Sequence, residues 1–174
     1  MRKLLFASSA VSLLASPAIA ALPVGSKAPE VITMGATGGK PFKFNLKQEL
    51  RKGPVVLYFF PKAFTKGCTL EAHAFSDAAA KFRQEGAQVI GLSAGDLPTL
   101  ERFSVEACRN QFPVGVATPE TIKAYDVSWT GYPGMTDRTS YVIDRKGKVV
   151  FAYSDLDWSH HVEKTLAAVA ALKH

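Results

Sequence analysis

A cysteine stands where a buried strand is followed by a helix. Residues 55–60 are continuously apolar and rich in β-branched and aromatic types, which predicts a strand covered on both faces. Pro61 ends that strand, because proline has no N–H to donate to a neighbour, and a short loop brings Cys68 into the first turn of a helix. Backbone N–H groups and the helix dipole stabilise a thiolate there. We therefore expect a reactive Cys68; the alternative is a small apolar residue that fills space at a helix start.

Thr65 and Arg138 are the polar residues that could assist this cysteine. Thr65 lies three residues before Cys68, so its hydroxyl could reach the sulfur or a bound substrate. Arg138 precedes residues 140–144, which are expected to form a strand, and could lie at the mouth of the sheet. A guanidinium there would stabilise the thiolate and hold an incoming oxygen. The alternative is a solvated loop arginine, the usual location of this residue type.

The arrangement of these residues resembles the peroxiredoxins of the AhpC/TSA type. PKAFTKGC, residues 61–68, is similar to the family's peroxidatic motif, and GCTLE, residues 67–71, resembles the subgroup of bacterioferritin comigratory protein and peroxiredoxin Q. RTSYVID, residues 138–144, resembles the family's arginine-bearing strand. The resemblance covers nearly all of the chain after its N-terminal leader. It implies a thioredoxin-like fold and the reduction of hydrogen peroxide and organic hydroperoxides, with these catalytic residues: Cys68, Thr65, Arg138 and Pro61.

Cys108 is the only other cysteine, and its role has three interpretations. No C-x-x-C motif starts at Cys68, which argues against a thioredoxin or a disulfide isomerase. In many relatives of the resembled subgroup a resolving cysteine follows five residues after the peroxidatic one, and here that position is His73. Cys108 could resolve oxidised Cys68 as an intramolecular disulfide, hold a permanent disulfide, or stay a buried free thiol. We favour resolution, followed by reduction by an external dithiol such as a thioredoxin-like protein.

Two other function classes stay open. One is a one-cysteine peroxidase that a small external thiol recycles without Cys108. The other is a non-enzymatic thiol redox sensor, in which Cys68 oxidises slowly because its surroundings do not activate it.

The N-terminal sequence predicts a secretory signal peptide. Arg2 and Lys3 precede an apolar run over residues 4–15, and small residues flank Ile19. The run is too short for a membrane span, which needs about 20 residues. We expect cleavage after Ala20, no stable membrane insertion afterwards, and a periplasmic or secreted protein; an uncleaved anchor is the alternative.

The charge and histidine content point to no nucleic acid, metal or cofactor. Loss of residues 1–20 leaves 19 basic and 15 acidic residues, a net charge of +4 that is spread along the chain. The adjacent His160 and His161 should point to different sides of a helix, so they are poorly placed to bind the same metal ion. Sulfur itself carries the electrons, so no cofactor is expected. The protein should be a monomer or homodimer.

Residues 21–174 are expected to form one α/β domain. Strands and helices alternate, which predicts a sandwich around a central sheet, and the resemblance makes it a thioredoxin-like fold with a mixed sheet flanked by helices and an N-terminal β-hairpin extension. On the helix of Cys68, Leu70, Ala74, Phe75 and Ala78 recur at helical spacing and should face the core. The expected strands cover residues 31–33, 42–44, 55–60, 87–93, 112–116, 140–144 and 148–153.

Overall fold

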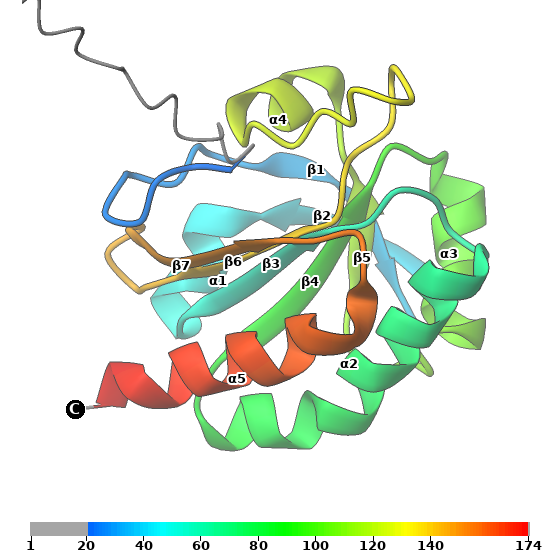
Figure 1. The fold of residues 1–174 in the computed structure, drawn as a ribbon. Coiled ribbons are helices and arrows are strands. Elements are labelled where there is room, and N and C mark those ends of the chain that lie inside the picture. The colour runs from blue at the N-terminus through cyan, green and yellow to red at the C-terminus, as the bar shows by residue number, and fades with distance from the viewer. Residues whose placement is uncertain (1–20, 174) are drawn as a thin grey trace, which may run out of the picture.

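The computed structural model describes residues 21–173, so the predicted signal peptide, residues 1–20, lies outside the described residues. This part of the chain forms one mixed sheet whose seven strands run in the order β2-β1-β5-β4-β3-β6-β7 (Figure 1). The strands are β1 (Ile32–Thr37), β2 (Lys40–Asn45), β3 (Val55–Phe59), β4 (Gln88–Ser93), β5 (Val114–Val116), β6 (Thr139–Ile143) and β7 (Val149–Ser154). The helices are α1 (Leu46–Lys52), α2 (Lys66–Gln84), α3 (Leu97–Glu106), α4 (Pro119–Ala124) and α5 (His161–Ala170), with 3-10 turns η1 (Trp158–His160) and η2 (Ala171–Lys173).

β3 is an interior strand of the sheet. It pairs in parallel with β4 and antiparallel with β6, and all five of its residues are buried. A strand that is covered on both faces must be apolar throughout, which explains the uninterrupted run VVLYF. The predicted N-terminal hairpin is present as β1 and β2, and β1 also pairs with β5, so the hairpin forms one edge of the main sheet.

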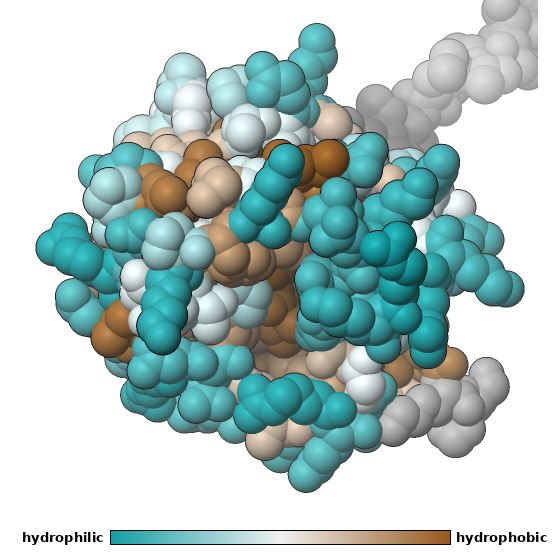
Figure 2. All heavy atoms as spheres, turned by 180° about the vertical axis from the view of Figure 1, so that it is seen from behind, coloured by the Kyte–Doolittle hydropathy of each residue, from teal (hydrophilic) through white to brown (hydrophobic). Residues whose placement is uncertain are grey.

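Helices cover the two faces of the sheet. α2, α3 and α5 pack on the face that contains Tyr58 and Phe60, and α1 and α4 pack on the face that contains Leu57 and Phe59 (Figure 1). Seen from behind, the surface is mainly hydrophilic and the apolar side chains lie largely in a recess (Figure 2). No helix within residues 21–173 is long and apolar enough to cross a membrane.

The register of α2 differs from the prediction in one respect. Phe75 and Ala78 are buried as expected, but Leu70 is 36 % exposed and Ala74 is half-buried. The buried stripe starts at Cys68 and continues at intervals of four and three residues, through Ala72, Phe75, Ala79 and Phe82. The acidic Glu71 is also buried on this side of the helix, in a position that a count of apolar residues does not reveal.

Candidate active site

Cys68 is the third residue of α2 and lies almost wholly inside the protein, 2 % exposed. Thr65 is the residue that caps this helix. Gly67, immediately before the cysteine, leaves room for other groups: a Cβ placed there would lie 3.3 Å from Nη2 of Arg138 and 3.8 Å from Trp158. The predicted order of strand, loop and helix is therefore present, and it places the sulfur at a helix N-terminus where the backbone dipole favours negative charge.

Arg138 reaches this cysteine from the residue before β6. Its Nη2 lies 3.5 Å from Sγ of Cys68, its Nε donates to the carbonyl of Leu156 at 2.9 Å, and its Nη1 forms an ion pair with Glu71. Only 5 % of Arg138 is exposed. The solvated-loop alternative is thus wrong, because the guanidinium is held on three sides in a buried site.

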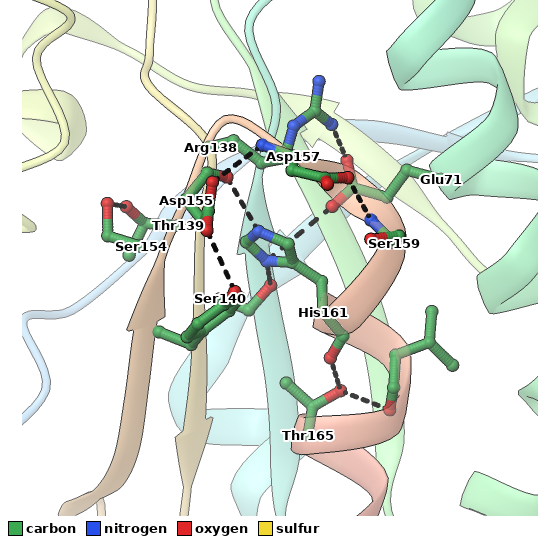
Figure 3. A network of polar contacts seen from close by, with 12 residues as sticks. Glu71, Arg138, Thr139, Ser140, Ser154, Asp155, Asp157, Ser159, His161 and Thr165 are labelled. Atoms are coloured by element: carbon green, nitrogen blue, oxygen red, sulfur yellow. Dashed lines mark hydrogen bonds and ion pairs between the residues drawn. The ribbon is translucent and has the colours of Figure 1, made fainter.

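Glu71 and His161 complete a polar network that our sequence reasoning missed (Figure 3). Both are 0 % exposed. His161 bonds through Nδ1 to Oγ of Ser140 at 2.8 Å and through Nε2 to the carbonyl of Asp155 at 2.9 Å. Glu71 Oε1 lies 3.8 Å from Nδ1 of His161 and has no hydrogen-bond partner among the described residues.

Burial shifts the acidity of both residues. It raises the pKa of Glu71 from its ordinary 4.5 to about 8, against the opposing charge and hydrogen bond of Arg138. It lowers the pKa of His161 from 6.5 to about 4. One signal for Glu71 was available in the sequence, since it lies three residues after Cys68 and hence on the same side of a helix.

Thr65 and Pro61 lie on the loop that leads to α2. The Thr65 hydroxyl donates to the carbonyl of Lys62 at 3.0 Å, and the residue is exposed. Pro61 is half-buried, and its carbonyl accepts a hydrogen bond from Ser93 Oγ at 3.4 Å. Neither makes a hydrogen bond with Cys68 among the described residues, so their catalytic roles stay predictions.

Cys108 lies just after α3, fully buried, and both cysteines are free thiols. Its carbonyl accepts a hydrogen bond from Ser76 Oγ at 2.9 Å. Ser76 is eight residues after Cys68 on α2, which corresponds to about 12 Å along the helix axis, whereas a disulfide needs its two Cα atoms within about 7 Å. Burial also raises the pKa of the Cys108 thiol well above its ordinary value. The contact with Ser76 thus places the Cys108 carbonyl about two turns along α2 from Cys68.

The segment that carries Cys108 has an unusual backbone. Arg109 and Asn110, which follow it, have φ values of 50° and 61°. The left-handed region is unfavourable for most residues other than glycine. This turn therefore stores local strain next to the second thiol.

Comparison with known proteins agrees with this geometry. Residues 24–152 match the sequence profile of the AhpC/TSA family. A chloroplastic peroxiredoxin Q of Populus jackii is 31 % identical over 148 residues, covering 84 % of this chain and 68 % of the relative. The corresponding protein of Triticum aestivum is also 31 % identical over 148 residues, covering 78 % and 67 %.

Two solved structures have the same architecture. Peroxidoxin BcpB of Mycobacterium tuberculosis superposes with a TM-score of 0.75 at 29 % identity, covering 87 % of this chain and 98 % of that one. A reduced 2-Cys peroxiredoxin of Plasmodium vivax gives 0.77 at 23 % identity, with 87 % and 96 % covered, and supports the thioredoxin-like fold alone. The fold and the cysteine beside a buried arginine define a thiol-based oxidoreductase. The chain belongs to the AhpC/TSA family and is a peroxiredoxin of the peroxiredoxin Q type, that is, a thiol peroxidase.

Proposed function

We propose that Cys68 is the peroxidatic residue and that it reduces hydrogen peroxide and organic hydroperoxides. The contact that carries the proposal is the 3.5 Å approach of Arg138 Nη2 to Cys68 Sγ at the start of α2. The Cys68 thiolate attacks the terminal peroxide oxygen and the O–O bond breaks. Water or an alcohol leaves once the departing oxygen has taken a proton, and Cys68 becomes a sulfenic acid.

Arg138 stabilises the charge that moves from sulfur to oxygen during this step. Its Nε is fixed by Leu156 and its Nη1 by Glu71, so the remaining nitrogen is already directed to the reacting sulfur. A donor that is held in place before the reaction costs no reorganisation in the transition state. The guanidinium therefore acts with the backbone amides of the first turn of α2.

Thr65 and Pro61 are proposed to shape the peroxide site. A hydroperoxide carries one O–H, and the Thr65 hydroxyl, which already donates to Lys62, can accept a hydrogen bond from it. Pro61 presents no N–H and borders the same loop, so it shields the sulfenic acid from water. Both roles follow from the position of the loop immediately before α2.

Cys108 is proposed to condense with the sulfenic acid, releasing water and forming a Cys68–Cys108 disulfide. The Cys108 carbonyl contacts Ser76, about two turns along α2 from Cys68. Disulfide formation would therefore involve rearrangement of the first turns of α2, of the turn at Arg109 and Asn110, or of both. An external dithiol, such as a thioredoxin-like protein, then reduces the disulfide by thiol exchange.

A one-cysteine peroxidase is the second candidate, and the position of Cys108 favours it. The thiol is buried, and the turn that carries it is hydrogen-bonded to Ser76. In that case an external thiol attacks the sulfenic acid directly. For either mechanism we propose a periplasmic or secreted location, on the basis of the leader in residues 1–20.

The intact mass of the reduced protein after one equivalent of hydrogen peroxide separates these candidates. Wild type should lose two hydrogens, while Cys108→Ser should gain one oxygen and Cys68→Ser should not change. Wild type that stops at one added oxygen supports the one-cysteine mechanism. No rapid change in either wild type or Cys108→Ser would refute the assignment of Cys68 as the peroxidatic residue.

A further inference from the structure

The ring nitrogens of His161 have unequal partners. Nε2 faces the carbonyl of Asp155, which can only accept a hydrogen bond, so Nε2 carries a proton. In the neutral ring Nδ1 is then an acceptor, and it accepts a hydrogen bond from the Ser140 hydroxyl. Glu71 Oε1, 3.8 Å from this same nitrogen, consequently faces an acceptor and not a donor.

An ionised Glu71 is poorly matched to this environment. Its Oε1 is fully enclosed, and among residues 21–173 no donor supplies it with a hydrogen bond. A buried anion with an unpartnered oxygen is unfavourable. A proton on Oε1 removes this charge. It also relieves the repulsion between a carboxylate oxygen and the Nδ1 lone pair, which already accepts from Ser140 and lies too far, at 3.8 Å, for a hydrogen bond to Glu71.

The charges of the buried site lead to the same state. Arg138 is one cation that contacts two acids, Cys68 through Nη2 and Glu71 through Nη1. If both acids were ionised beside a neutral His161, whose pKa burial lowers to about 4, this enclosed site would carry a net negative charge. Only one anion can be balanced, and the peroxidase reaction needs that anion to be the sulfur.

The other ionisable groups that face the pair do not remove the imbalance. Burial raises the pKa of Tyr58 on β3 well above its ordinary value, so its hydroxyl stays neutral. Tyr153 on β7 stacks edge-on against the His161 ring at 4.8 Å between centroids. Asp155 and Asp157, in the exposed loop before α5, add only negative charge.

We propose that Glu71 is a proton-holding partner of the peroxidatic cysteine: at neutral pH its Oε1, on the side that faces His161, carries a proton while Cys68 is a thiolate. Cys68 releases one proton on ionising and Glu71 keeps one, so the Arg138 charge remains available to the sulfur. His161 acts through Glu71 as a positioning residue. This inference rests on the proposed role of Cys68. It adds an explanation of how the charge of Arg138 is balanced by the Cys68 thiolate alone.

The pH profile of Cys68 alkylation tests the proposal in a Cys108→Ser background, where Cys68 is the only thiol. The rate should show a lower step, from thiolate formation, and an upper step, from loss of the Glu71 proton. Glu71→Gln should abolish the upper step and leave the lower one in place. His161→Gln should move the upper step by more than about 0.5 pH unit. His160→Gln, a matched control because His160 is 58 % exposed, should move neither step.

Two outcomes of the alkylation experiment would overturn the proposal. If Glu71→Gln lowers the midpoint of thiolate formation by about one pH unit or more, Glu71 was ionised and was competing for Arg138. If His161→Gln leaves the upper step unmoved, His161 does not influence the Glu71 proton.

Two spectroscopic measurements test the protonation state itself. The infrared spectrum of wild type at neutral pH should contain a protonated-carboxyl band that Glu71→Gln lacks, and its absence refutes the proposal. If that variant does not fold, nitrogen NMR of wild type decides: His161 should be neutral with its proton on Nε2, and an imidazolium contradicts the proposal. If the carboxyl band is present but peroxide leaves Cys68 unchanged, the peroxidase assignment fails and the protonated pair stands.

Discussion

Replacing Arg138 by methionine removes three polar contacts of one buried side chain. The change should affect both the rate of Cys68 oxidation and the stability of the fold, and the two effects can be measured separately. The contact with Cys68 is a hydrogen bond from a charged guanidinium, and hydrogen bonds to charged groups are worth about 1.5–3 kcal/mol. If the transition state uses all of it, oxidation of Cys68 slows by about 10- to 150-fold, at 1.36 kcal/mol for each factor of ten. Arg138→Lys keeps the charge without the planar fork, so its rate should lie in between.

The effect on stability depends on the charge of Glu71. Removing one partner of a buried ion pair typically costs about 3–5 kcal/mol, because a charge is left unbalanced. A Glu71 whose pKa is raised to about 8 is already largely neutral at pH 7. We therefore expect a loss nearer the cost of unmade hydrogen bonds, about 1–3 kcal/mol. Adding Glu71→Gln to Arg138→Met should cause little further loss.

Stopped-flow fluorescence can follow the oxidation, because Trp158 lies beside Gly67 at the start of α2. Urea unfolding gives the stability of the same variants. Arg145→Met is the matched control, since Arg145 is exposed and follows the opposite end of β6 from Arg138. A rate for Arg138→Met within about threefold of wild type, less than 1 kcal/mol, would refute the role given to the guanidinium.

Three further changes have defined outcomes. The free energy of unfolding should fall as the pH rises from about 6.5 to 8, because folded Glu71, with its pKa raised from 4.5 to about 8, keeps a proton that the unfolded chain releases. Between pH 4.5 and 6.5 the lowered pKa of His161 makes the free energy of unfolding rise with pH, which partly cancels the contribution of Glu71. Urea titrations of Glu71→Gln should show no fall in the free energy of unfolding between pH 6.5 and 8. Ser76→Ala removes a buried hydroxyl that donates to the carbonyls of Ala72 and Cys108, so it should lower stability by about 1 kcal/mol. Loss of the bond to Cys108 should also free the turn that carries this residue and speed disulfide formation, as measured by thiol loss. An unchanged or slower rate of thiol loss contradicts this reasoning. Gly91→Ala would place a Cβ 2.6 Å from Cζ of Tyr58, and thermal or urea unfolding should show a loss of about 1–3 kcal/mol; an unchanged midpoint contradicts the tight contact.

The parts of this structure that sequence reasoning predicted depend on local chemistry. Asn45 and Thr118 accept hydrogen bonds from the backbone N–H groups of Gln48 and Thr121, a cap that an Asn or Thr directly before a helix can form with its nearest neighbours. The apolar run before Pro61 forms β3, a strand inside the sheet, for an equally local reason. These features need only a few neighbouring residues.

The features that were missed depend on which surfaces meet in three dimensions. Glu71 is buried because its side of α2 meets Arg138 and α5, and no count of apolar residues places an acid there. His161 was considered only as a metal ligand, although its contacts to Ser140 and Asp155 come from two other segments. The distance between Cys68 and Cys108 depends on which turn of α2 the segment after α3 contacts, and that contact is at Ser76.

The contacts that are proposed to prepare Cys68 for oxidation also hold the start of its helix. Arg138 joins the first turns of α2 to β6 and to the loop before α5, through Cys68, Glu71 and Leu156. A sulfenic acid is a weaker acceptor than a thiolate, so the proposed oxidation weakens one of these links at the moment when the helix start has to move. A protonated Glu71 likewise binds the guanidinium less strongly than a carboxylate does. The charge balance that favours the thiolate therefore also keeps the helix start loosely held, and a fully ionised Glu71 would oppose both steps.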